Sequence, residues 1–283
     1  MPALKFAIQQ VVRHLERGPH PERARLDAET LLLHVLGKNK AWLLTHPEEE
    51  ISDDQAARYN RLVERRYAGE PMQYITGRQE FYGLPFGVTP NVLIPRAETE
   101  HLVEKVLSLF AGFDRPRIVD VGTGSGAIAV ALAHRMPRAE ITALDISPAA
   151  LEQARANAEE NGVAGRLRLV RSDLLAEVAS QKFEVVVSNP PYVATGDRES
   201  LSVEVREYEP ALALFAGTDG LDVYRRLIPA AFAVLESGGF LAMEAGYGQS
   251  PAIAELMRPA GFEGIEFAPD LQGIARVACG RRP

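Results

Sequence analysis

The sequence predicts an α/β protein in which a small all-helical domain and a β-hairpin linker precede a doubly wound, Rossmann-like sheet. From residue 117 onward, short apolar runs alternate with helical patterns, as strands and helices do in a mostly parallel sheet. Residues 1–75 show helical periodicity instead. Between them, residues 80–95 (EFYGLPFGVTPNVLIP) mix aromatic and β-branched residues with Gly and Pro, which indicates a short hairpin or an extended linker.

The N-terminal segment is expected to contain three helices. The apolar face of the first is made by Leu4, Ile8, Val11 and Leu15. Residues 26–36 form a second apolar-rich stretch. Ser52 followed by Gln55 predicts a capping box that opens a third helix, and Gly69 and Pro71 close it.

The rest of the chain reads as alternating strands and helices. Strands are expected at residues 117–121, 140–145, 166–173, 183–190 and 239–246, with two further strand-like pieces at 263–267 and 274–279. Helices are expected at residues 97–110, 126–136, 148–162, 221–235 and 250–261. The domain boundaries predicted from this pattern are 1–75, 76–95 and 96–283.

Charge and cysteine content narrow the class of protein. Residues 1–75 hold 11 basic and 11 acidic residues, so the net charge of −7 belongs to the remainder. An acidic body disfavours a broad nucleic-acid-binding face, which needs clustered Lys and Arg. The single cysteine, Cys279, excludes an internal disulfide and a multi-cysteine zinc site, and one thiol suits a reducing compartment.

The sequence also gives expectations about location and metals. It shows neither a signal-peptide pattern nor an apolar run long enough to span a bilayer, so a cytoplasmic protein without membrane contact is expected. The six histidines form no metal-binding spacing such as H-E-x-x-H, and no metal is expected.

A glycine-rich loop follows the first strand of the α/β part. VDVGTGSGAIAV places Gly122, Gly124 and Gly126 between a strand and a helix, with Thr123 and Ser125 between the glycines. Such a loop lets a ligand approach the backbone, and the helix N-terminus favours an anionic group. Taken alone, the loop also fits the NAD fingerprint or a tight turn without a ligand.

Three aspartates at successive strand ends favour S-adenosylmethionine over NAD as the ligand. Asp145 ends the next strand, where a carboxylate can accept hydrogen bonds from both ribose hydroxyls. Asp120 can face a cationic amino group, which S-adenosylmethionine has and NAD lacks. Asp173 can accept from an adenine amino group while Leu174 packs on the ring. Open α/β sheets bind ligands at this edge.

The tetrapeptide Asn189-Pro190-Pro191-Tyr192 lies at the end of the fourth expected strand, in the stretch FEVVVSNPPY, at the same edge. Because proline lacks an N–H, this loop offers carbonyl acceptors without competing donors. The Asn189 side-chain oxygen and the Pro190 carbonyl can accept both hydrogens of a planar NH2 group, and Tyr192 can cover its flat face. Held in this way, the nitrogen is aimed at a methyl donor.

The pairing of DVGTGSG with NPPY resembles class I S-adenosylmethionine-dependent methyltransferases that act on planar amino nitrogens. The further segments LIPRAETE (93–100), EYEPALALFAGTDGLDVYRRL (207–227) and MEAGYGQ (243–249), with the helical N-terminal domain, resemble the release factor glutamine-N5 methyltransferases over nearly the whole chain. This family often has proline where the chain has Ala97, and some members have an aromatic residue at the position of Leu174.

The resemblance implies roles for the site and its partners. Residues 122–126, Asp145, Leu174 and Asn189 bind S-adenosyl-L-methionine, whose product is S-adenosyl-L-homocysteine. Residues 189–192 hold the substrate glutamine, and Arg96 and Thr99 border the site. The expected partner is a class I peptide chain release factor, methylated at the glutamine of its glycine-glycine-glutamine loop. Residues 1–75 are then a substrate-docking domain and residues 96–283 the catalytic domain.

Three other functions remain open at this point, as does the role of one basic helix. A nucleic-acid adenine-N6 methyltransferase would also hold a planar NH2. NAD-dependent redox chemistry leaves NPPY unexplained, and a non-catalytic module would bind the cofactor without turnover. One expected helix carries four arginines, Arg58, Arg61, Arg65 and Arg66. They form either an ordinary solvated face or a docking patch for the partner.

Overall fold

The computed structural model describes residues 3–109 and 114–283, and the chain divides into two compact units. The first, here called the helical unit, comprises Met1–Gly77 together with Leu201–Tyr208. The second, here called the sheet unit, comprises Arg78–Ser200 and Glu209–Pro283. The predicted boundaries did not anticipate that a segment near residue 200 lies with the N-terminal helices.

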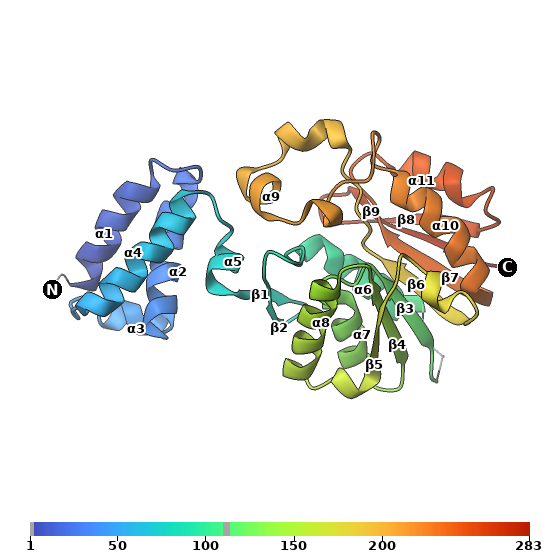
Figure 1. Ribbon diagram of the computed structural model, residues 1–283, viewed down its shortest axis with the longest axis horizontal. Helices are drawn as coiled ribbons and strands as arrows, with labels where there is room; N and C mark the ends of the chain where they lie inside the picture. Colours follow the sequence, from blue (N-terminus) through green and yellow to red (C-terminus); the bar gives the residue numbers. More distant parts are fainter. Residues whose placement is uncertain (1–2, 110–113) are drawn as a thin grey trace. The chain divides into compact units, whose positions relative to one another are not determined.

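The helical unit contains α1 (Leu4–Leu15), α2 (Ala24–Leu36), α3 (Lys40–Thr45), α4 (Asp53–Tyr67), α5 (Met72–Thr76) and α9 (Val203–Tyr208) (Figure 1). The predicted capping box is confirmed at the start of α4: the Ser52 hydroxyl accepts from the Gln55 N–H, and the Gln55 side chain accepts from the Ser52 N–H. In the core between the helices, the buried Tyr59 hydroxyl donates to the Ala28 carbonyl at 2.9 Å. Helices α1, α2 and α4 therefore share one apolar core.

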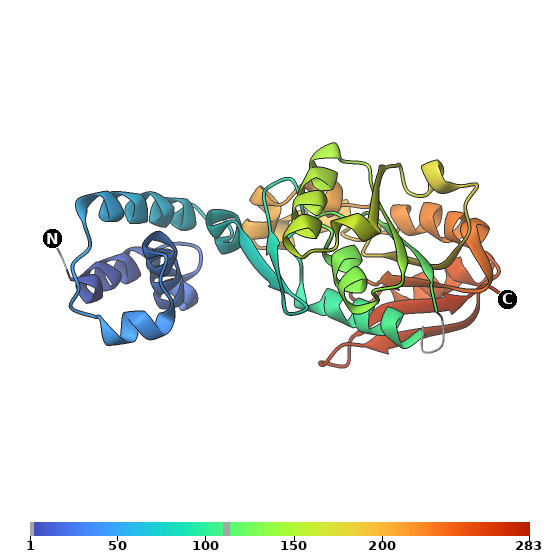
Figure 2. The same cartoon turned by 90° about the horizontal axis from the view of Figure 1, so that it is seen from below.

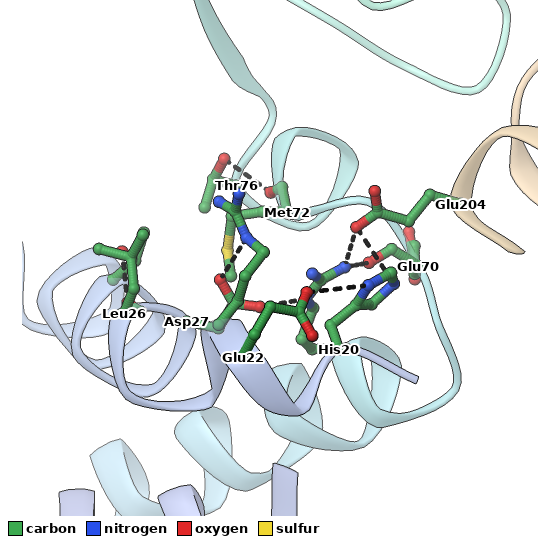
Figure 3. A network of polar contacts seen from close by, with 11 residues as sticks. His20, Glu22, Leu26, Asp27, Glu70, Met72, Thr76 and Glu204 are labelled. Atoms are coloured by element: carbon green, nitrogen blue, oxygen red, sulfur yellow. Dashed lines mark hydrogen bonds and ion pairs between the residues drawn. The ribbon is translucent and has the colours of Figure 1, made fainter. Parts of the chain in front are cut away.

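A buried ion-pair network joins α9 to the N-terminal helices. The Arg66 guanidinium donates from Nε to Asp27 at 2.6 Å and from Nη1 to the Glu70 carbonyl at 3.0 Å, and it also pairs with Glu204 of α9. His20 lies 3.4 Å from the same Glu204 carboxylate. Figure 3 shows these carboxylates converging from α2 and α9. The network explains why Leu201–Tyr208 belongs to this unit.

The backbone after α4 also fits α9 closely. Gly69 has a φ of +93°, and a Cβ placed on it would meet the Val203 side chain at 2.8 Å. A larger residue would clash with α9 in addition to straining the backbone. Gly69 therefore ends α4, as predicted, and also makes room for α9.

The sheet unit begins with the predicted hairpin and continues into a seven-stranded sheet. The hairpin strands are β1 (Arg78–Phe81) and β2 (Leu84–Gly87). The sheet strands are β3 (Arg117–Val121), β4 (Glu140–Asp145), β5 (Leu167–Arg171), β6 (Phe183–Ser188), β7 (Leu235–Glu244), β8 (Glu263–Pro269) and β9 (Ala275–Arg281). Their order is β5-β4-β3-β6-β7-β9-β8, in which the first five strands run parallel and β9 pairs antiparallel with both β7 and β8.

Helices cover both faces of this sheet. They are α6 (Glu100–Leu109), α7 (Ala127–Arg135), α8 (Pro148–Glu160), α10 (Asp222–Val234) and α11 (Ser250–Met257). Helices α6, α7 and α8 lie with the hairpin on one face, and α10 and α11 lie on the other (Figure 1, Figure 2). Their apolar side chains belong to two separate core clusters, one on each face. The predicted doubly wound α/β fold is confirmed. Across residues 3–109 and 114–283, every helix is too short or too polar to cross a bilayer.

The strand order locates the ligand crevice. After β3 the chain builds β4 and β5 on one side, then returns to place β6 on the other side of β3. Such a reversal leaves a crevice at the carboxyl ends of the two central strands, where open α/β sheets bind ligands. The loops after Val121 and Ser188 both begin at that crevice.

Candidate active site

A cavity of about 290 Å³ lies at the carboxyl ends of β3, β4 and β6, within the sheet unit. Eleven of the residues predicted from the sequence line it: Arg96, Thr99, Gly122, Thr123, Gly124, Ser125, Asp145, Asp173, Leu174, Asn189 and Pro191. Four predicted residues are not on its wall: Asp120, Gly126, Pro190 and Tyr192. Segments far apart in the sequence thus meet at one cavity.

The glycine loop leaves the floor of the cavity open. Gly122 and Gly124 have φ values of +72° and +56°, and a Cβ built on either meets no atom within 4 Å. A ligand can therefore approach this backbone directly. Gly126 differs, because its Cβ would lie 3.1 Å from the Cβ of Ala154 on α8. The third glycine thus allows close helix packing behind the loop.

Asp145 is held at the rim by two backbone donors. Its carboxylate accepts from the Gly124 N–H at 2.8 Å and from the Ser147 N–H at 2.9 Å. Burial raises the pKa of Asp145 above its usual value, while these hydrogen bonds oppose that shift. Each carboxylate oxygen keeps further acceptor capacity for a ligand hydroxyl. This geometry suits the predicted role in ribose binding, which stays a prediction.

Asp120 is fully buried at the end of β3, behind the glycine loop. One carboxylate oxygen accepts from the Thr123 hydroxyl at 2.6 Å. The other oxygen, Oδ1, has no hydrogen-bond partner in the described part of the chain. Burial raises the pKa of Asp120 to about 7. A buried, incompletely satisfied carboxyl beside the loop is suited to a cationic group.

Asp120→Asn is expected to stabilise the protein increasingly as the pH rises. The Asp120 pKa is about 7 in the folded state and near 3.9 in an unfolded chain, so the folded protein loses stability between those values. Asparagine cannot ionise, so the variant should gain roughly 2–4 kcal/mol over wild type above pH 7. Urea unfolding at pH 5 and pH 8 measures this gain. An equal difference at both pH values would contradict the burial of an ionisable carboxyl there.

Asp173 and Leu174 form the wall after β5. The Asp173 carboxylate pairs with Arg226 of α10 at 2.6 Å, and both residues line the cavity. Leu174 has a φ of +50°, in the left-handed region that β-carbon-bearing residues avoid. This local strain keeps an apolar side chain on the wall, where the flat face of a base can pack. Contacts of either residue with adenine stay predictions.

The NPPY loop is anchored at both ends. At its start the Ser188 hydroxyl donates to the Val121 carbonyl of β3 at 2.7 Å, and the Asn189 amide nitrogen donates to the Thr99 hydroxyl oxygen at 3.0 Å. At its end the half-buried Tyr192 donates from its hydroxyl to Glu244 at 3.3 Å. Burial and the Glu244 carboxylate raise the pKa of Tyr192. Covering of a substrate by its ring stays a prediction.

Glu244 is a residue that sequence reasoning did not single out. It is 2% exposed at the end of β7 and also accepts from the Thr99 hydroxyl at 2.5 Å. Burial raises the pKa of its carboxyl. The available signal was an acidic residue directly after the apolar run GFLAM, in a segment that had been quoted only as a family motif.

Arg96 lies on the cavity wall with a partner from a distant segment. Its guanidinium donates to both carboxylate oxygens of the buried Glu209, at 2.6 and 2.8 Å. Both contacts come from Nη2, and this ion pair ties the 93–100 segment to the chain that continues along the wall at Pro210 and Leu212. The two family-like segments quoted from the sequence therefore meet at one side of the cavity.

Comparisons with known proteins agree with this architecture. The family model described as "PrmC N-terminal domain" matches residues 7–77, and the one described as "Methyltransferase small domain" matches residues 98–206. A methyltransferase from Pyrococcus furiosus, of known crystal structure, shares the fold at a TM-score of 0.53 and 21% identity, over 79% of this chain and 98% of its own.

Curated relatives match almost the entire chain. The release factor glutamine methyltransferase of Koribacter versatilis is 45% identical over 281 residues, which is 99% of each protein. That of Moorella thermoacetica is also 45% identical, over 96% of each protein. With this identity over its full length, the chain belongs to the family of release factor glutamine methyltransferases.

Proposed function

We propose that this protein transfers a methyl group from S-adenosylmethionine to the side-chain amide nitrogen of the glutamine in the glycine-glycine-glutamine loop of class I peptide chain release factors. The observation that carries the proposal is the orientation of Asn189 on the cavity wall. Its amide nitrogen is engaged by Thr99, so its oxygen is the free acceptor of the pair. A planar NH2 group needs such an acceptor.

The residues present fit S-adenosylmethionine. Gly122 and Gly124 leave the cavity floor open, Asp145 supplies carboxylate oxygens at its rim, and the buried Asp120 carboxyl, when ionised, supplies negative charge behind the loop. When bound, S-adenosylmethionine supplies a methyl group already activated by a sulfonium centre. No strong base is therefore required before attack on it. The protein's part is to position the acceptor nitrogen.

Positioning falls to the NPPY loop. An amide nitrogen is a poor nucleophile because its lone pair is delocalised into the carbonyl group. The Asn189 side-chain oxygen and the Pro190 carbonyl accept its two hydrogens, and neither Pro190 nor Pro191 has an N–H to compete for those acceptors. Fixed acceptors of this kind aim the lone pair at the methyl group and stabilise the charge that develops on nitrogen. The proton leaves after transfer.

The helical unit is the proposed docking surface for the release factor. Free glutamine would offer the reacting amide but little binding area, whereas a folded protein adds contacts far from the chemistry. The arginine patch predicted on α4 needs one correction: Arg66 is 2% exposed and paired within its own unit, so it is not available to a partner. Arg58 and Arg61 are exposed and remain candidates for docking.

An acceptor panel tests the proposal. The protein and methyl-labelled S-adenosylmethionine are incubated with one candidate substrate at a time. The candidates are an intact class I release factor, the same factor with its loop glutamine changed to alanine, free glutamine, DNA and RNA. We expect label in the intact factor alone, because only it offers both the reacting amide and a large binding area. Equal labelling of the alanine variant, or stronger labelling of adenine in DNA or RNA, would contradict the proposal.

A further inference from the structure

A continuous polar chain runs from the end of β7 to the NPPY loop. It consists of Glu244, Thr99 and Asn189, which lie far apart in the sequence. Glu244 and Thr99 are 2% and 4% exposed. Their oxygens are 2.5 Å apart, and the Asn189 amide nitrogen is 3.0 Å from the Thr99 hydroxyl oxygen.

The chemistry of the three groups determines which group donates and which accepts in each hydrogen bond. An ionised carboxylate only accepts, so Thr99 must give its single hydroxyl hydrogen to Glu244. The Thr99 oxygen is then left as an acceptor, and it must meet a donor. The Asn189 NH2 group is that donor. The opposite orientation of the amide would place the Asn189 oxygen against the Thr99 oxygen, with no hydrogen between them.

The same carboxylate holds the far end of the loop. Its second oxygen accepts from the Tyr192 hydroxyl at 3.3 Å, while the Tyr224 hydroxyl donates to the Glu244 backbone carbonyl at 2.7 Å. Burial raises the Glu244 pKa, and the Thr99 and Tyr192 hydroxyls and the Arg276 guanidinium act against that rise. Above this raised pKa the carboxylate is ionised and accepts from both hydroxyls.

We propose that Thr99 and Glu244 are positioning residues that fix which way the Asn189 amide faces. The amide nitrogen is turned to Thr99, and the amide oxygen is presented to the substrate nitrogen that receives the methyl group. This inference rests on the proposed function. It changes the role predicted for Thr99, from bordering the substrate to acting through Asn189. It also gives a role to Glu244, which joins the first and last residues of the NPPY loop.

Loss of the Thr99 contact should affect turnover more than binding of S-adenosylmethionine. An Asn189 amide released from Thr99 can turn over and present its NH2 group to the substrate NH2 group, so two donors would face each other. Turnover should then fall because the reacting nitrogen is no longer held. Binding of S-adenosylmethionine should change little, because the groups proposed to hold it lie on the glycine loop and at Asp145.

The test uses Thr99→Val, which keeps the shape of the side chain but removes the hydroxyl, and Thr99→Ser, which restores the hydroxyl. Thr142→Val makes the same change at a buried threonine of β4 outside the cavity wall and serves as the control. At metal sites, loss of a residue that orients a ligand lowers activity by about 10- to 100-fold. By analogy, we expect a loss of that size in the kcat of Thr99→Val, relative to the control. Thr99→Ser should recover most of the loss.

A second variant tests the carboxylate. Glu244→Gln has one acceptor oxygen, so only one of the Thr99 and Tyr192 hydroxyls can still donate to it. We expect a lower kcat, and no more than about a twofold further loss in the Thr99→Val/Glu244→Gln double variant, because residues on one path are not additive. If the kcat loss of the double variant equalled the product of the two single losses, the two residues would act separately. That result would overturn their proposed action through Asn189.

The outcomes separate this inference from the proposed function. Wild-type protein that labels no release factor would contradict the proposed function. Wild-type protein that labels the factor, together with a kcat for Thr99→Val within twofold of Thr142→Val, would overturn the positioning role alone. A Thr99→Ser variant as impaired as Thr99→Val would also overturn it, because the hydroxyl would then not be the group that matters.

Discussion

Asn189→Ala is expected to lower kcat by about 10²–10³-fold while the fold is retained. Asn189 lines the cavity with its amide nitrogen bound to Thr99, its side-chain oxygen is the proposed acceptor, and loss of one preorganised polar contact at a reacting centre has an effect of this size. The side chain is only partly buried, and its removal leaves no apolar cavity in the core. Single-turnover kinetics with saturating release factor measures the chemical step directly.

An asparagine-to-alanine change away from the cavity serves as a matched control for the effect on kcat. Asn161→Ala, at the end of α8, removes an amide that donates to the Pro85 carbonyl away from the cavity, and it should leave kcat nearly unchanged. Calorimetry should find S-adenosylmethionine binding by Asn189→Ala reduced far less than kcat. If kcat fell less than tenfold in the Asn189 variant, the loop would not be holding the reacting nitrogen.

Arg66→Ala is expected to destabilise the helical unit by about 3–5 kcal/mol. Arg66 and Asp27 are each 2% exposed and joined at 2.6 Å, so removing the guanidinium leaves the buried carboxylate with only the longer 3.6 Å pairing to Arg23. The same change removes one of the two partners of Glu204 on α9, the other being His20. Hydrogen exchange should therefore show faster opening in α2, α4 and residues 201–208.

Two further variants test the cause of this loss. Arg65→Ala removes the neighbouring, exposed arginine, whose pairing with Glu70 at 2.5 Å is worth about 1 kcal/mol or less, as is usual for surface pairs. The double change Arg66→Met with Asp27→Leu replaces both buried charges by apolar groups and should restore much of the stability. Similar losses for Arg65→Ala and Arg66→Ala would show that the buried network is not what stabilises the unit.

The strand ends and helix caps of this protein could be predicted because they depend on neighbouring residues. The run RIVDV before a glycine and Ser52 with Gln55 are local signals, and the structure has an element boundary at each. The strand expected at 183–190 ends two residues earlier, at Ser188. Because parallel strands end at one edge, the sequence also indicated that the glycine loop, Asp145 and Asn189 would meet.

What could not be predicted depends on contacts between distant segments. Helix α9 has six residues, too few for a periodic pattern, and it joins the helical unit through Glu204 and Arg66. The short helices α3 and α5 escaped for the same reason of length. Glu244 looked like an ordinary strand end until the structure showed Thr99 and Tyr192 donating to it. The inward orientation of Asp120 is likewise a consequence of tertiary packing.

The proposed holding of a glutamine side-chain amide by the NPPY loop can be tested on the reaction product itself. Fragmentation mass spectrometry of an intact class I release factor, after reaction with methyl-labelled S-adenosylmethionine, locates the methyl group for wild-type protein and for Asn189→Ala. We expect one methyl group on the amide nitrogen of the loop glutamine with wild type, and about 10²–10³-fold slower modification with the variant. A methyl group on any other residue of the factor, or equal rates for the two proteins, would contradict it.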